Sequence, residues 1–192
     1  MGQVEPLTES FVTHSAGETR ALGEALGRVL APGDFVALLG DLGAGKTELA
    51  RGVAKGCRVA ADEVASPTFA LVHHHHGRIP LVHADLFRLT GEDDLYGTGY
   101  DELRDSPELA LMVEWADRIP GAIPADALRV QLAQAEGEPD RREVTATATG
   151  SGARRLLDRW RAEVGAPPAR AAPVSSRPAS ASPPAGRRRR GR

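Results

Sequence analysis

The most constraining feature of the chain is the segment Gly-Asp-Leu-Gly-Ala-Gly-Lys-Thr at residues 40–47, which matches the phosphate-binding pattern G-x-x-x-x-G-K-[ST]. An apolar run at 34–39 precedes it and is typical of a buried parallel strand, and a helical run at 48–55 follows it. The glycines let the loop turn tightly and direct backbone N–H groups at a phosphate, beside the positive end of the helix. The predicted nucleotide contacts are Asp41, Leu42, Gly43, Ala44, Gly45, Lys46 and Thr47.

Two side chains of this loop carry the predicted chemistry. Lys46 would reach the β- and γ-phosphate oxygens, and the Thr47 hydroxyl would ligate Mg²⁺. The chain contains only one other lysine, Lys55, and its other basic side chains of this kind are arginines. A lysine at position 46 therefore indicates that the site requires a compact ammonium group and not a planar guanidinium. The alternative is a glycine-rich strand–helix turn that binds nothing.

Length and charge divide the chain into two parts. Its 192 residues suit one domain over residues 1–165, followed by a tail at 166–192 that has seven arginines and no acidic residue. We expect this Pro/Ala/Ser/Arg-rich tail to be disordered, although it can also contact RNA or an acidic surface. The remainder is acidic, which is unlike a general nucleic-acid binder.

The cellular location is predicted from what the sequence lacks. There is one cysteine, Cys57, so an intramolecular disulfide is impossible, and we assign it no role because it lacks a CxxC partner and an obvious basic activating group. We find neither an apolar run of transmembrane length nor a secretory signal. We therefore expect a soluble cytoplasmic protein that does not contact membranes.

Periodicity and turn residues predict an α/β fold. A capping box formed by Ser15 and Glu18 begins a helix that we expect to extend from residue 16 to about 29, and Gly56 resembles the end of the next helix. Alternating and apolar runs predict a mixed, mainly parallel sheet, as in a three-layer P-loop NTPase domain. The other expected strands are 10–13, 68–72, 79–83, 109–113, 127–132 and 142–148, and a last helix covers 151–164.

Acidic residues close two apolar strands, at the edge where α/β proteins place ligand chemistry. Glu114 would bind Mg²⁺ together with Thr47, and Trp115 would shield the site, stack on a partner or pack in the core. Asp85 would orient the attacking water or hold a metal-bound water, and its plainer alternative is an aspartate that caps a turn. Arg88 would pair with a phosphate or with an acid of the fold.

Two further segments are less informative. Ser66 or Thr68, in the segment Ser-Pro-Thr-Phe at 66–69, would sense Mg²⁺ or the γ-phosphate, unless the segment is a plain turn. The four histidines at 73–76 resemble a metal clip, but adjacent residues of an extended segment point to opposite faces. We interpret them as the exposed tip of a hairpin.

These blocks occur in the order found in the TsaE family, the small bacterial ATPases of tRNA threonylcarbamoyladenosine synthesis, which the chain resembles over roughly residues 10–160. The matching segments are 40–47, 66–69, His-Ala-Asp-Leu-Phe-Arg at 83–88, and Glu-Trp at 114–115. The resemblance implies that Asp85, Glu114, Lys46 and Trp115 are needed for ATP turnover. It also implies nucleotide contacts near Thr19 and from a late arginine, for which Arg142 is a candidate.

The resemblance implies partners as well. Family members bind ATP or ADP with Mg²⁺ and act with the proteins TsaB and TsaD, which modify the adenosine beside the anticodon of tRNA. The family member resets this pair by ATP hydrolysis and reaches tRNA only through the complex. Three features depart from the family: Phe87, where a tyrosine is usual, the histidine run and the arginine tail.

The alternative functions are a P-loop small-molecule kinase and a nucleotide-dependent interaction module that does not hydrolyse ATP.

Overall fold

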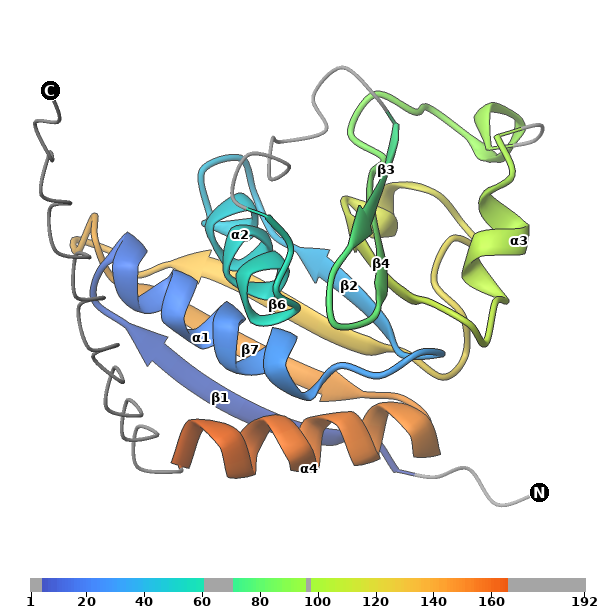
Figure 1. Ribbon diagram of the computed structural model, residues 1–192. Helices are drawn as coiled ribbons and strands as arrows, with labels where there is room; N and C mark the ends of the chain where they lie inside the picture. Colours follow the sequence, from blue (N-terminus) through green and yellow to red (C-terminus); the bar gives the residue numbers. More distant parts are fainter. Residues whose placement is uncertain (1–4, 61–70, 96–97, 166–192) are drawn as a thin grey trace, which may run out of the picture.

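The computed structural model describes residues 5–60, 71–95 and 98–165 (Figure 1). Its helices are α1 (Ala16–Val29), α2 (Lys46–Gly56), α3 (Tyr100–Arg104), α4 (Ser151–Gly165) and the short 3-10 turns η1 (Glu92–Asp94) and η2 (Ala116–Arg118). Its strands are β1 (Leu7–Thr13), β2 (Phe35–Leu39), β3 (Val72–His76), β4 (Pro80–Asp85), β5 (Ala110–Glu114), β6 (Leu128–Gln134) and β7 (Arg142–Ala148). These strands form one seven-stranded sheet in the order β1-β7-β6-β2-β5-β4-β3.

Most strands of the sheet run in the same direction. Strands β4, β5, β2 and β6 are parallel neighbours, β3 is antiparallel to β4, and β7 is antiparallel to both β6 and β1. The predicted mixed, mainly parallel sheet is therefore confirmed. Because β2, β4 and β5 are parallel, their carboxyl ends meet at one edge, and the segments that follow them build the site.

Each face of the sheet has its own core, which confirms the three-layer arrangement. Val36 and Leu38 of β2 pack with residues of α1, α2 and α4, whereas Phe35, Ala37 and Leu39 pack with Tyr100 of α3 and Ala116 of η2. This alternation follows from the strand geometry, in which successive side chains point to opposite faces. Figure 1 shows α1, α2 and α4 together on one side of the strands.

Glycines allow α1 and α2 to pack with their backbones in contact. A Cβ atom at Gly27 would lie 2.1 Å from the Val53 carbonyl oxygen, and one at Gly56 would lie 2.2 Å from the Glu24 carbonyl oxygen. Gly56 is thus the last residue of α2, as expected, but the close approach explains the glycine. The left-handed residue beyond the helix is Arg58, with φ of 62°.

The histidine run is not a hairpin tip, and that prediction is wrong. His73 to His76 form β3, paired residue for residue with β4, and His75 is only 4% exposed. The turn lies at Gly77, where a Cβ atom would meet the Cys57 carbonyl oxygen at 2.2 Å. The prediction failed because a run of one residue type hides the alternation that marks a strand. Most of the strand expected at 68–72 lies outside the described residues, as do the tail and residues 66–69.

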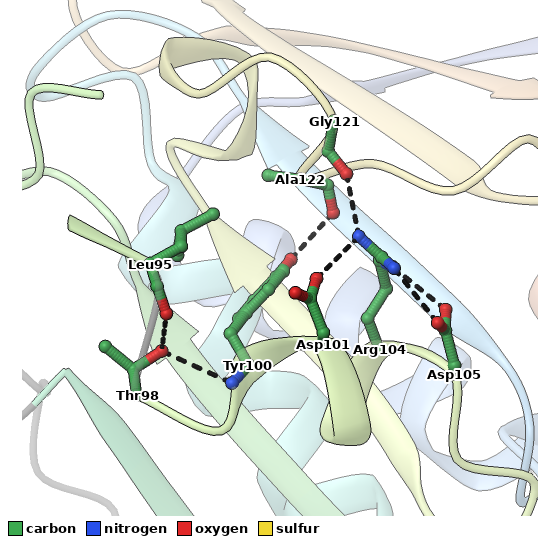
Figure 2. A network of polar contacts seen from close by, with 8 residues as sticks. All are labelled: Leu95, Thr98, Tyr100, Asp101, Arg104, Asp105, Gly121 and Ala122. Carbon is green, nitrogen blue, oxygen red and sulfur yellow. Dashed lines mark hydrogen bonds and ion pairs between the residues drawn. The ribbon is translucent and has the colours of Figure 1, made fainter. Parts of the chain in front are cut away.

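The segment around α3 is anchored to the chain that leaves the site (Figure 2). The Tyr100 hydroxyl donates to the Ala122 carbonyl at 2.8 Å, and Arg104 donates to the Gly121 carbonyl at 3.1 Å and pairs with Asp101 and Asp105. Burial raises the pKa of Tyr100, so this hydroxyl stays protonated and keeps donating. The contacts of Tyr100 and Arg104 hold the chain beyond η2 against α3. No helix within the described residues is long and apolar enough to cross a membrane.

Candidate functional site

The loop between β2 and α2 has the backbone that a phosphate cradle requires. Gly40, Gly43 and Gly45 have φ values of 127°, 82° and 105°, which side-chain-bearing residues rarely adopt. At Gly40 there is also no room for a side chain, since a Cβ atom would lie 2.2 Å from the Leu132 carbonyl oxygen. Gly45 is the N-cap of α2 and provides no side-chain cap. The N-terminus of α2 therefore keeps backbone N–H groups for an anion.

Lys46 lies folded into this loop. Its Nζ donates to the carbonyl oxygens of Gly40 at 2.6 Å and Asp41 at 2.9 Å, and it lies 3.6 Å from the centre of the Trp115 ring. Burial lowers the pKa of Lys46, while the charges of Glu114 and other nearby carboxylates raise it. The ammonium is thus held in a poorly solvated position where a phosphate would be a strong partner.

Thr47 and Glu114 meet, as predicted for two ligands of one metal ion. The Thr47 hydroxyl donates to Glu114 Oε2 at 3.3 Å, and Glu114 is 2% exposed. No group of three or more His, Cys, Asp or Glu side chains in the described parts of the chain could hold a metal. A hydroxyl and one carboxylate fit Mg²⁺, which commonly takes few protein ligands and completes its shell with phosphate oxygens and water.

Sequence reasoning missed the residue on the other side of this carboxylate. His83 Nε2 lies 3.0 Å from Glu114 Oε1, and His83 is 5% exposed. The available clue was its position in an apolar strand two residues before Asp85, which puts both side chains on one face.

Asp85 lies at the end of β4, directly beside Glu114 in the parallel register with β5. Its Oδ1 accepts a hydrogen bond from the Phe87 N–H at 2.9 Å. The aspartate therefore caps a turn, as the plainer alternative proposed, while it also lines the pocket. Burial raises the pKa of Asp85, and the Glu114 charge adds to this, whereas the Phe87 hydrogen bond and Lys46 lower it.

Trp115 is a wall of the site and is not a core residue. It has a left-handed φ of 61°, and its backbone N–H donates to the Leu38 carbonyl at 3.2 Å, which turns the chain sharply after β5. The centre of its ring lies 5.0 Å from that of Phe87, and the Arg118 guanidinium lies 5.1 Å from the centre of the Phe87 ring. Phe87 is 43% exposed, so this aromatic pair forms part of the rim.

These side chains enclose a pocket of about 390 Å³. It gathers most of the predicted residues from three strand ends and the loop. The lining consists of Leu42, Gly43, Gly45, Lys46, Thr47, Glu48, Asp85, Phe87, Glu114 and Trp115.

Four predicted contacts lie outside this lining. Asp41 and Ala44 belong to the loop, and Ala44 is 4% exposed. Arg142 donates to the Gly43 carbonyl at 3.4 Å, which places it against the loop. Thr19 is 1% exposed, its hydroxyl bonds that of Thr13 at 2.7 Å, and its methyl group would lie 3.8 Å from a Cβ atom at Gly45, so it packs against the loop. Direct nucleotide contacts by these residues stay predictions, as does the role of the exposed Arg88.

Known proteins resemble the chain in sequence and in fold. The pattern of the family described as "Threonylcarbamoyl adenosine biosynthesis protein TsaE" matches residues 13–144. The tRNA threonylcarbamoyladenosine biosynthesis protein TsaE of Bacillus subtilis is 38% identical over 70% of this chain and 82% of its own length. The protein of the same name from Treponema pallidum is 35% identical over 63% of this chain and 88% of its own length.

A solved structure agrees with the sequence comparison. The crystal structure of YdiB from Bacillus subtilis superposes with a TM-score of 0.69 and 28% identity, and covers 84% of this chain and 99% of that chain. The TsaE pattern spans the loop, both acid-bearing strands and the start of β7. The chain belongs to the TsaE family of threonylcarbamoyl adenosine biosynthesis proteins.

Proposed function

We propose that the chain binds ATP or ADP with Mg²⁺ in the 390 Å³ pocket and hydrolyses ATP. It does so for the threonylcarbamoyl modification of the adenosine beside the anticodon of tRNA, in the cytoplasm. The observation that carries the proposal is the convergence of Lys46, Thr47 and Glu114 at the carboxyl edge of the sheet. Family membership supports the process, because relatives such as the Bacillus subtilis protein are named for threonylcarbamoyladenosine biosynthesis.

Each side chain has a task in this proposal. Lys46 and the N-terminus of α2 hold the phosphates, and Lys46 exchanges its contacts with the Gly40 and Asp41 carbonyls for phosphate oxygens. Thr47 and Glu114 hold Mg²⁺, which when bound neutralises charge on the phosphate oxygens. Asp85 orients the attacking water, and Trp115 limits the access of solvent to Lys46.

The proposal includes activation by TsaB and TsaD. None of the described residues that line the pocket is an arginine. P-loop NTPases without such a charge turn over slowly, and an arginine supplied in trans accelerates them about 10³–10⁵-fold. The isolated chain should therefore bind nucleotide and hydrolyse it slowly until the TsaB–TsaD pair completes the site. It contacts tRNA only through that complex.

The test is steady-state phosphate release by the chain alone and with TsaB and TsaD, together with calorimetric titration of ADP. We expect Lys46→Ala to weaken nucleotide binding by about 1.5–3 kcal/mol, because a charge-assisted contact is lost. Lys55→Ala is the matched control, since Lys55 is the other lysine and pairs with Glu24 on the surface with a side chain 66% exposed. Asp85→Asn should retain nucleotide and lose turnover.

Two results would contradict the proposal. Unchanged ADP affinity of the Lys46→Ala variant would contradict the assignment of this loop as a phosphate-binding site. Equal rates of phosphate release with and without the TsaB–TsaD pair would refute activation by these partners.

A further inference from the structure

We propose that His83 is a positioning residue that holds the Glu114 carboxylate so that its second oxygen faces the metal ion. This inference rests on the proposed Mg²⁺ site. It assigns a role to a residue that the nucleotide-binding loop does not contain and that does not line the pocket.

The sheet brings the two residues together. Strands β4 and β5 are parallel with Asp85 opposite Glu114 and His83 opposite Met112, so His83, Asp85 and Glu114 share one face. Leu81 and Met112 of that face pack in the core that includes α2. The helix that begins with Lys46 and Thr47 therefore lies over the same face as His83 and Glu114.

The Glu114 carboxylate has a partner on each oxygen. Oε1 lies 3.0 Å from His83 Nε2, and Oε2 accepts from the Thr47 hydroxyl at 3.3 Å. A carboxylate that binds a metal is ionised and can only accept hydrogen bonds, so Nε2 carries the proton in the state that binds Mg²⁺. The shorter of the two contacts is the one to His83.

Metal binding would affect the two contacts of the Glu114 carboxylate differently. Thr47 and Glu114 Oε2 would hold Mg²⁺ in place of their contact with each other, whereas Glu114 Oε1 would keep its contact with His83. A carboxylate that is 2% exposed cannot replace a lost donor freely with water. His83 thus sets the orientation of the carboxylate plane, and partners of this kind are typically worth about 10–100-fold in metal affinity.

The experiment measures Mn²⁺ binding to the complex of the full chain with ADP, by the electron paramagnetic resonance signal of free Mn²⁺. We expect His83→Leu to weaken Mn²⁺ binding about 10–100-fold and to leave ADP affinity in EDTA unchanged. His83→Gln should rescue most of the affinity, because its amide N–H reaches towards Oε1. His73→Leu is the matched control, since His73 faces His83 across β3 and β4 and has no hydrogen bond to Glu114.

A double-mutant cycle separates positioning from a general structural role. In a Glu114→Gln background, His83→Leu should have no further effect on Mn²⁺ binding, because the role acts through the carboxylate. If His83→Leu fails to fold by circular dichroism, His83→Asn, with an amide too short to reach Oε1, takes its place with the same expectation.

The outcomes distinguish this inference from the proposed function. If the parental ADP complex binds Mn²⁺ and His83→Leu binds it equally well, the positioning role is overturned while the metal site stands. The positioning role is also overturned if His83→Leu weakens Mn²⁺ binding equally in the parental and the Glu114→Gln backgrounds. If the parental ADP complex does not bind Mn²⁺, the metal site is overturned and the inference with it.

Discussion

Asp85 occupies a position that disfavours its charge. Burial raises its pKa above the usual value of 3.8, and the neighbouring Glu114 charge acts in the same direction. Glu114 faces Asp85 across the register of β4 and β5 because both close their strands at the same edge. Two carboxylates held side by side repel each other, and a bound cation would relieve this repulsion.

We expect Asp85→Asn to raise the thermal unfolding midpoint of the protein without nucleotide at pH 7. Asn keeps the oxygen that accepts the Phe87 N–H, and it removes the charge whose burial opposes folding. Because the folded pKa is raised, the unfolded state loses this proton first, so the penalty develops as the pH rises from the usual pKa through the raised one. The gain should therefore vanish below about pH 4.

Differential scanning fluorimetry of the parent and the Asn variant across this pH range checks the expectation. An Asn variant that is no more stable than the parent at pH 7, or a gain that persists undiminished at acidic pH, would contradict it.

The pairing of α1 with α2 depends on residues that have no side chain. Gly23 and Gly27 of α1 face Gly52 and Gly56 of α2, and a Cβ atom at any of them would lie within 2.2 Å of a backbone oxygen of the other helix. The hydroxyl-rich start of α1 also lies behind the loop, where the Thr19 methyl would be 3.8 Å from a Cβ at Gly45. Close packing of these helices therefore fixes the position of the phosphate loop.

Gly27→Ala should destabilise the protein by about 1–3 kcal/mol, because the helices must separate to admit the methyl group. Gly17→Ala is the control on the same helix. Gly17 is exposed, and a Cβ there meets only the Ser15 Oγ at 3.7 Å, an ordinary contact. We expect this control to be neutral or stabilising by up to about 1 kcal/mol. Denaturant unfolding measures both, and equal stabilities of the two variants would refute the packing argument.

The last helix, α4, connects several elements that lie far apart in the sequence. Trp160 of α4 is fully buried, and its ring centre lies 4.8 Å from that of Phe11 of β1, with the rings tilted by 39°. Its indole N–H donates to the Leu22 carbonyl of α1 at 3.1 Å. Arg159 of the same helix pairs with Asp34 at 2.8 Å, just before β2. The C-terminal helix thus joins the first strand, the first helix and the strand that leads into the site.

Trp160→Ala should destabilise the protein by about 3–5 kcal/mol, through lost burial and the lost hydrogen bond to the Leu22 carbonyl. Truncation after Gly165 should leave the unfolding midpoint unchanged, because the core contacts of α4 end with Trp160. Thermal unfolding of the full chain, the truncated chain and the Trp160→Ala variant compares the two changes. A lower midpoint on truncation would show that residues 166–192 contribute to the folded domain, contrary to the disordered tail that we predict.

Local patterns were sufficient to predict the glycine-rich loop at 40–47 and most elements of the fold. Gly40, Lys46 and Thr47 are recognisable because the backbone conformation and the chemistry of a phosphate cradle restrict each position separately. The position of Glu114 at the carboxyl edge of the sheet was predicted from another local pattern, an acidic residue that ends an apolar strand. The helix from residue 16 to 29 begins and ends as predicted, because its cap and its apolar stripe are short-range properties.

Only the tertiary structure decided how distant segments meet. The register that sets Asp85 beside Glu114, the contact of His83 with that carboxylate and the burial of His75 all depend on strand pairing. The glycines of α1 and α2 are explained only by the partner helix. A sequence records the preference of each residue for burial and for backbone angles. Pairing between strands is a property of two segments together, and no single segment specifies it.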